Sequence, residues 1–430
     1  MTPIISVFAA KVVVSIGLSI MAVLLIRFRA QVLPVVQDRA PQVLGACFLF
    51  FRFIPFIIVY LILNEVPRND VPFFYEKATK ALQGGLVYRD YWSFHAPLFS
   101  YLIAIPLLIW HSPKAIVLLM VMTEAFTVWL TYRHYRRHNP EAGLLAVLYF
   151  MLPAPLVICL LGGQEDIGLW LFGLLTMVAA ARRKEPGLAI GLWMAAALLT
   201  LKVTFVMIAF PVFFLLGGKT RLRWMGALAL VGIPTLLLLY AVMGTQFMMP
   251  VQHGDIPFAP NLTTVLKPFL GTLFSHVPLK TLNWIGVAAT VTILATVGLR
   301  YRKLPYAAVF PSIWVMTFGL FMLFQPSAMA YYIFLFLIAA VFELTPARPG
   351  ARLWLLIVAN LVVVVQPFYW IYLDQIFFNS FADFNSPLKI FEYVLEVITV
   401  GCVAAYVWLA WKRLELLRNQ KPVKATPVAA

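Results

Sequence analysis

The chain has 430 residues, of which 63% are hydrophobic and only 12% are charged. A soluble domain is about half apolar and about a quarter charged, so this composition excludes a soluble globular protein and indicates that lipid surrounds most of the chain. The formal charge of +16 does not indicate nucleic-acid binding, because the basic residues lie in short loops between apolar runs. We therefore expect no nucleic acid among the partners.

The apolar runs follow one another almost to the end of the chain and predict an all-α integral membrane protein. We expect one polytopic membrane domain over 1–420 and a disordered cytoplasmic tail over 421–430. Arg52 and Glu124 lie inside predicted helices, where a charge needs a partner, but the sequence does not identify that partner. A spanning helix needs about 20 apolar residues, and we predict about 13 such helices, several of them short. They lie near residues 4–26, 43–63, 115–132, 142–161, 167–181, 187–201, 203–217, 225–243, 282–299, 306–324, 328–343, 352–369 and 388–411.

The loops between these runs differ in charge from one side of the predicted membrane to the other. Most of the 17 acidic residues lie in one set of alternate loops. Because Lys and Arg favour the cytoplasmic side, the basic loops are predicted to be cytoplasmic, and the N-terminus and segment 64–114 are predicted to lie outside. The basic set holds 22 of the 33 Lys and Arg residues, in segments 27–39, 133–137, 182–184, 219–223, 300–303 and 348–352 and in the tail from 412 to 424.

Segment 64–114 is the first long stretch too polar to cross a bilayer, and it holds the densest group of ionisable side chains in the chain. After Asp70 it continues as a predicted amphipathic helix over 72–83, which can lie along the membrane surface. The apolar run 97–111 is too short to span and is predicted to be interfacial or re-entrant. We expect this outer segment, with its juxtamembrane helix, to carry the chemistry.

Asp70 is open to two interpretations. An Asp immediately before Val71 and Pro72 is a good N-cap, because its side chain can accept a hydrogen bond from a free backbone N–H of the helix. A carboxylate that a rigid amphipathic helix holds at the membrane surface is also well placed to act as a general base. The two roles are compatible.

The run from 70 to 90, DVPFFYEKATKALQGGLVYRD, with His95-Ala96-Pro97-Leu98 after it, resembles the first outer loop of GT-C glycosyltransferases. It is similar to the loops of bacterial protein-mannosyltransferase relatives and of polyprenyl-phosphate mannosyltransferases. Those loops read as Asp, an aromatic pair, an Ala-rich helix, Gly, Tyr-Arg-Asp and His-Pro-Pro-Leu. This chain departs from them at Ala96, and at Val71, where many relatives carry a second acid. The resemblance is close over 69–103 and looser over the first half of the chain.

The resemblance implies a GT-C fold, a polyprenyl-phosphate-linked sugar as donor, Asp70 as catalytic base and inversion at the sugar carbon. Relatives carry an acid at the start of a later helix, where Asp166 is the best match, and a Lys in a Leu-Thr-Lys context, where this chain has Lys202. By this resemblance Asp166 would orient a substrate and Lys202 would bind the donor phosphate. In the alternative interpretations Asp166 caps a helix and Lys202 snorkels to the outer interface.

Arg89, Asp90 and His95 complete the candidate substrate-binding residues. Arg89 and His95 are further candidates for binding phosphate, because the fork of an Arg side chain matches phosphate oxygens. In the alternative interpretation Arg89 forms an ion pair with Asp90, and His95 is a buried, hydrogen-bonded histidine. We expect no required cofactor, and no residue pattern supports metal ligands for a divalent ion.

The expected function is transfer of a sugar from a polyprenyl-phosphate-linked donor to an acceptor hydroxyl of a glycan, lipid or protein. The expected place is the outer, periplasmic face of a bacterial inner membrane, whose lipid is a further partner. The alternative is a transporter or flippase for lipid-linked glycans, with intramembrane charges lining its pathway. Transporters usually show two similar halves, which this sequence lacks. A third interpretation is a non-catalytic assembly protein of the cell envelope.

Overall fold

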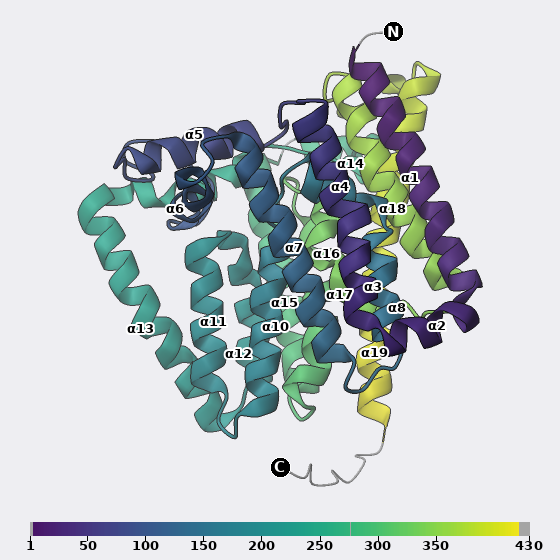
Figure 1. Cartoon of the computed structure of the whole chain (residues 1–430). Helices are drawn as coiled ribbons and strands as arrows, with labels where there is room; N and C mark the ends of the chain where they lie inside the picture. The colour runs from purple at the N-terminus through teal and green to yellow at the C-terminus, as the bar shows by residue number, and fades with distance from the viewer. Residues whose placement is uncertain (1–2, 276, 421–430) are drawn as a thin grey trace.

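The computed structural model describes residues 3–275 and 277–420, and no β-strand occurs among them. The long helices run between two ends of the molecule, and α1 begins at one end while α19 finishes at the other (Figure 1). Shorter 3-10 and π-helical segments connect or extend several helices. The α-helices are α1 (Pro3–Arg27), α2 (Arg29–Asp38), α3 (Ala40–Phe48), α4 (Ile54–Phe56), α5 (Val71–Leu82), α6 (Phe99–Ala104), α7 (Pro113–Tyr135), α8 (Ala142–Phe150), α9 (Pro153–Pro155), α10 (Ile167–Arg182), α11 (Gly187–Thr200), α12 (Val206–Leu215), α13 (Gly218–Met243), α14 (Leu262–Ser275), α15 (Leu279–Tyr301), α16 (Tyr306–Phe324), α17 (Phe334–Leu344), α18 (Ala351–Tyr372) and α19 (Pro387–Asn419).

Eight helices in the described part of the chain are long and apolar enough to cross a membrane, or nine if one bent pair forms a single span. This makes the chain a multi-pass membrane protein, but it does not confirm the expected count of 13. Four of the 13 expected spans correspond to helices that are too short to count as spanning. Each of these four helices has one end at a polar loop that enters the bundle from one side, and these loops are 162–166, 201–202 and 325–329. Such irregular backbone is tolerated at membrane depth where protein surrounds it, and it shortens the helices that it interrupts. The four short segments are Ile167–Arg182, Gly187–Thr200, Val203–Leu215 and Ala330–Leu344.

The core of the bundle is formed by α16 and α17. Every residue of α16 from Val309 to Leu323 is buried, and so is every residue of α17 except Glu343. Helix α16 packs against α10, α12, α15, α17 and α19. A helix that is apolar on all sides is stable only when other helices or lipid cover all of it, and here helices do so.

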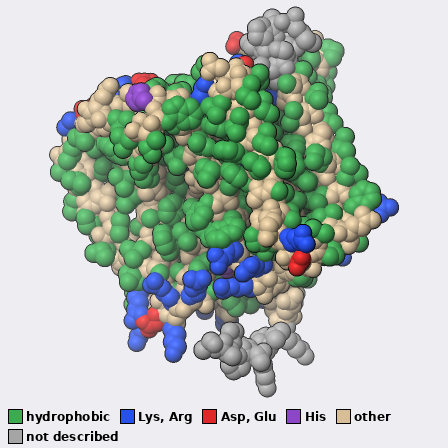
Figure 2. All heavy atoms as spheres, in the orientation of Figure 1, with side chains coloured by type: hydrophobic (Ala, Val, Ile, Leu, Met, Phe, Trp, Pro, Cys, Tyr) green, Lys and Arg blue, Asp and Glu red, His purple; other side chains and the backbone are tan. Residues whose placement is uncertain are grey.

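The surface of the molecule carries a broad apolar band. Helix α13 contributes to it, because only Trp224 and Ala227 of this helix are buried. Figure 2 shows this band, with Lys and Arg side chains gathered beyond it at the end where α19 finishes. This asymmetry agrees with the assignment of that end to the cytoplasm. We refer to the opposite end, where α5 and α6 lie across the bundle, as the outer end (Figure 1).

The outer segment is close to its prediction. Helix α5 differs by one residue at each end from the expected range 72–83. Of the apolar face expected at Phe74, Ala78, Ala81 and Leu82, the first two are buried, Ala81 is half-buried and Leu82 is exposed. The run 97–111 contains only a short helical stretch, Phe99–Leu108. This stretch leaves Ile105 and Leu108 exposed, as an interfacial segment would. The expected tail over 421–430 lies outside the described residues.

Helices α11 and α13 approach each other closely at two glycines of α11. A Cβ on Gly187 would lie 2.1 Å from the carbonyl oxygen of Thr220, and a Cβ on Gly191 would lie 2.6 Å from the Cβ of Ala227. Small residues at this spacing allow two membrane helices to pack with their backbones close together.

We expect Gly191→Val to push α13 away from α11 and to lower the free energy of unfolding by about 1–3 kcal/mol, because the added methyl groups have no space. Unfolding by denaturant titration in detergent measures this change. Gly226→Val is the matched control, since a Cβ at Gly226 of α13 meets nothing within 4 Å. An equal loss in both variants would show that the β-branched side chain, and not the close contact, is responsible.

Candidate functional site

Four segments that are distant in the sequence meet at the outer end of the bundle. They are the start of α5, the segment 93–98, the loop 162–166 before α10, and the break at 201–202 between α11 and α12. Together they hold Asp70, His95, Asp166 and Lys202, four of the six site residues that the sequence predicts. We refer to these four residues, with Gln164 and Glu165, as the outer cluster.

Asp70 stands at the N-terminus of α5, but its side chain makes no capping hydrogen bond. Its Oδ2 instead accepts a hydrogen bond from Gln164 Nε2 at 2.5 Å. The interpretation of this side chain as an N-cap is therefore wrong. The residue as a whole is only partly buried.

The loop 162–166 reaches Asp70 because glycine allows a close contact with α5. Gly163 has φ of +65°, a left-handed conformation that favours glycine. A Cβ on Gly163 would lie 2.2 Å from Cγ2 of Val71, which is itself fully buried. The position where many GT-C relatives carry a second acid is therefore a packing contact here, and it places Gln164 beside Asp70.

Lys202 is held between two carboxylates. Its Nζ lies 2.8 Å from Oε1 of Glu165 and 2.6 Å from Oδ1 of Asp166. The Lys202 side chain is 16% exposed, and the two acidic side chains are 1% and 0% exposed. The snorkelling interpretation of Lys202 is therefore wrong. Asp166 precedes α10 but makes no capping hydrogen bond, so its interpretation as a cap is wrong as well.

The two acids differ in their partners and therefore in their pKa. Burial alone would raise the pKa of Glu165, but the Lys202 ammonium and the hydrogen bond from His95 lower it below the usual value. For Asp166, burial and the neighbouring Glu165 charge raise the pKa to about 6, although Lys202 opposes the rise. At neutral pH Lys202 therefore lies between two ionised acids, whose carboxylate oxygens are 2.8 Å and 2.6 Å from its Nζ.

His95 joins the outer segment to this ion cluster. Its Nε2 lies 3.2 Å from Oε1 of Glu165, and burial lowers the pKa of His95, which favours the neutral ring. The backbone beside it is bonded to the end of α11: Ala96 N–H donates to the Leu201 carbonyl at 3.0 Å, and Leu98 N–H donates to the Leu199 carbonyl at 2.9 Å. His95 is thus hydrogen-bonded and largely buried, with 13% of its side chain exposed, which is close to its alternative interpretation, and it lies inside the cluster.

Arg89 and Asp90 lie apart from the other site residues. They form an exposed ion pair at 2.8 Å, and Oδ2 of Asp90 accepts a hydrogen bond from the Leu86 N–H. Neither makes a hydrogen bond or ion pair with the outer cluster among the described residues. The arrangement matches the alternative interpretation of Arg89 as the ion-pair partner of Asp90.

The sequence reasoning missed Gln164, Glu165 and Lys77. Lys77 is buried on α5, with its ammonium 5.0 Å from the centre of the Trp92 ring, and it has no ion pair among the described residues. Burial lowers the pKa of Lys77, and the charges of Asp70 and Glu165 oppose that shift. The sequence did contain a sign that Lys77 is buried: it lies three residues after Phe74, and residues three apart share one face of a helix.

Several polar atoms of the cluster are buried without a hydrogen-bond partner among the described residues: Gln164 Oε1, Glu165 Oε2, Asp166 Oδ2 and His95 Nδ1. Buried polar atoms are usually paired, so a concentration of unpaired ones indicates a site that can bind a polar ligand. No group of three or more His, Cys, Asp or Glu residues in the described part of the chain is arranged to hold a metal ion.

Comparison of the chain with protein-family models, with curated proteins and with solved structures finds no match. The resemblance to GT-C enzymes therefore rests on the residues of the outer segment. The function has to be argued from the geometry of the outer cluster and the chemistry of its side chains.

Proposed function

We propose that the protein is a membrane glycosyltransferase of the GT-C type. It transfers a sugar from a polyprenyl-phosphate-linked donor to an acceptor hydroxyl at the outer face of a bacterial inner membrane. One observation carries the proposal: the carboxylate of the partly buried Asp70 does not cap its helix and lies beside a buried ion cluster at the outer end. A carboxylate held in this way is suited to remove a proton from a hydroxyl group.

In the proposed reaction the acceptor oxygen attacks the anomeric carbon of the donor and gives its proton to Asp70. The bond between that carbon and the phosphate oxygen breaks, and the polyprenyl phosphate leaves with the bonding electrons. Negative charge therefore grows on the leaving phosphate, where a nearby cation lowers the barrier. Lys77 is the buried cation of this region without an acidic partner among the described residues, and Lys202 is the second, its charge shared by Glu165 and Asp166.

Asp70→Asn tests the role of the carboxylate as a base. Asn keeps the size of the side chain but cannot accept the proton, so we expect transfer to fall by more than about 100-fold. The measurement is transfer from a panel of radiolabelled polyprenyl-phosphate sugars by the full chain in liposomes. Glu76→Gln is the matched control, because Glu76 lies on the same helix and its side chain is 60% exposed.

The control variant is expected to keep wild-type transfer. Equal transfer by Asp70→Asn and wild type would contradict the proposed base and would leave Asp166 as the next acid to test. No transfer by any of the proteins, together with movement of the glycolipid between leaflets, would contradict the enzyme and favour the flippase.

A further inference from the structure

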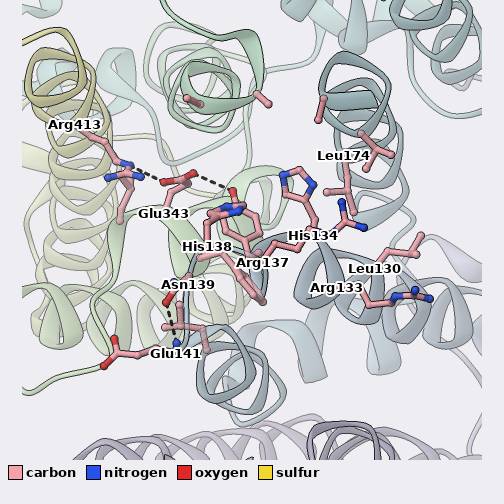
Figure 3. Close-up of a pocket in the computed structure, with 18 of the residues that line it drawn as sticks. Leu130, Arg133, His134, Arg137, His138, Asn139, Glu141, Leu174, Glu343 and Arg413 are labelled. Carbon is pink, nitrogen blue, oxygen red and sulfur yellow. Dashed lines mark hydrogen bonds and ion pairs between the residues drawn. The ribbon is translucent and has the colours of Figure 1, made fainter. Parts of the chain in front are cut away.

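A cavity of about 900 Å³ lies at the end of the bundle opposite the outer cluster (Figure 3). It lies among the ends of α7, α10 and α17, the start of α18 and the last part of α19. This volume is in the range of small-molecule binding sites, which are about 300–1,000 Å³. The lining combines apolar side chains, such as Leu174 and Phe342, with a group of cationic ones.

The two carboxylates of the lining already have partners. Glu343 pairs with Arg413 at 2.5 Å (Figure 3). It also accepts a hydrogen bond from the Tyr135 hydroxyl at 3.1 Å. Glu141 pairs with Arg29, which is outside the lining, at 2.6 Å. Neither acid is therefore free to neutralise the other cations of the cavity.

Four further arginines line the cavity without an acidic partner in the described part of the chain: Arg133, Arg137, Arg182 and Arg352. Arg133 lies against the Trp129 ring, and Arg352 donates to the Leu344 carbonyl. Arg137 and Arg182 make no hydrogen bond, ion pair or ring contact with any described residue. Two exposed guanidinium groups on different elements thus line one cavity, and no described protein group competes with a ligand for them.

The orientation of the protein in a membrane does not require this arrangement. The excess of Lys and Arg on the cytoplasmic side depends on how many basic residues the loops hold, and not on whether they line a common cavity. Burial together with the nearby Arg413 and Arg137 charges lowers the pKa of His138, which also lines the cavity. A site that holds so much positive charge close together is stabilised when an anion enters it.

We propose that this cytoplasmic cavity binds a phosphate group, with Arg137 and Arg182 as the principal contacts. The planar fork of an Arg side chain matches two phosphate oxygens, and two such forks from different segments can hold one group from both sides. The apolar part of the lining accommodates an uncharged portion of the ligand. The phosphate can come from the headgroup of an anionic phospholipid of the inner leaflet or from a soluble phosphate compound.

The test is binding of two probes to the purified full chain in detergent, at about 150 mM salt so that long-range attraction is screened. One probe is a short-chain phosphatidic acid and the other is inorganic phosphate. Native mass spectrometry counts the bound lipid, and a titration of the thermal unfolding midpoint gives the apparent Kd for each probe. The double variant Arg137→Gln/Arg182→Gln is expected to weaken binding about 30-fold, because each lost guanidinium contributes about a factor of five.

The control is the double variant Arg136→Gln/Arg183→Gln. It removes the same charge at the adjacent positions, which do not line the cavity, and it is expected to leave binding nearly unchanged. Binding of either probe that weakens in the Arg137→Gln/Arg182→Gln variant supports the site. Binding of the lipid alone indicates a phospholipid headgroup, whereas binding of inorganic phosphate as well indicates that a soluble phosphate compound can also occupy the site. Equal weakening in the two double variants, or no binding of either probe by the wild-type chain, would overturn the proposal.

Discussion

Replacement of Lys202 by Gln is expected to lower the free energy of unfolding by about 3–5 kcal/mol at neutral pH. The cation separates two acids whose side chains are 1% and 0% exposed, and Gln leaves both without a positive partner. A buried carboxylate without such a partner is costly, and here there are two. Unfolding curves in detergent, recorded for the wild type and the variant, measure the difference.

The size of this effect is expected to depend on pH. In the wild type the pKa of Glu165 is lowered, so its charge stabilises the fold at neutral pH, and this contribution is lost as the pH falls. Without Lys202, burial is expected to raise the pKa of Glu165 in the folded state above its value in the unfolded state. The stability of the variant then decreases as the pH rises. We therefore expect a larger deficit at about pH 8 than at about pH 5, because protonation removes the buried charges.

The control for this pair of measurements is Lys202→Arg, which keeps the positive charge. We expect it to retain more stability than Lys202→Gln at pH 8 and to show a smaller change between the two pH values. A Lys202→Gln deficit that is the same at both pH values would mean that lost packing, and not the unpaired acids, causes it.

Arg52→Met is expected to cause a loss of similar size, about 3–5 kcal/mol, within the bundle. Arg52 and Glu124 are both fully buried, and they form two hydrogen bonds, Nε to Oε2 at 2.7 Å and Nη2 to Oε1 at 3.0 Å. Nη1 also donates to the Phe150 carbonyl at 3.1 Å, at the point where α8 ends and the next helix begins at an angle of 52°. Met removes the donor for this carbonyl and leaves Glu124 as an isolated buried charge.

The double variant Arg52→Met/Glu124→Met distinguishes the two losses. Replacement of both charged partners by apolar side chains removes the isolated charge, so most of the stability should return. The part that does not return measures the contact with the helix break. If Arg52→Met alone unfolds at the wild-type denaturant concentration, the ion pair does not stabilise the fold.

The position of the helices was predictable to a large extent, because every expected span overlaps an observed helix or bent helix pair. An apolar run identifies a helix in lipid whatever its neighbours are. The lengths were less predictable at 167–181, 187–201, 203–217 and 328–343, because hydropathy does not reveal that polar loops enter the bundle there. The partnership of Arg52 with Glu124 was out of reach for a similar reason, since it depends on how two helices are rotated against each other.

Most residues of the candidate site were predictable from the sequence, but Glu165, which connects them, was not. Asp166 was chosen from a run of polar residues, whereas the neighbouring Glu165 contacts both Lys202 and His95. Both acids face inward, and the sequence does not show that Glu165 also reaches His95, because that contact depends on how the loop 162–166 packs against the segment 93–98. Arg89 and Asp90 were predicted from the Tyr-Arg-Asp motif and from the match of an Arg side chain to phosphate. In the structure the turn at 88–91 buries Tyr88 and Tyr91 and leaves Arg89 and Asp90 as an exposed ion pair away from the cluster.

The two backbone hydrogen bonds between the segment 96–98 and the end of α11 have a mechanical consequence. They join the outer segment to the helical bundle as one strand is joined to another, with donors on one side and carbonyls on the other. The backbone that carries His95 and the backbone that carries Lys202 are therefore joined directly, so a displacement of one segment also displaces the other. In the proposed reaction, a donor that displaces the segment 96–98 from the bundle would also have to break these two hydrogen bonds.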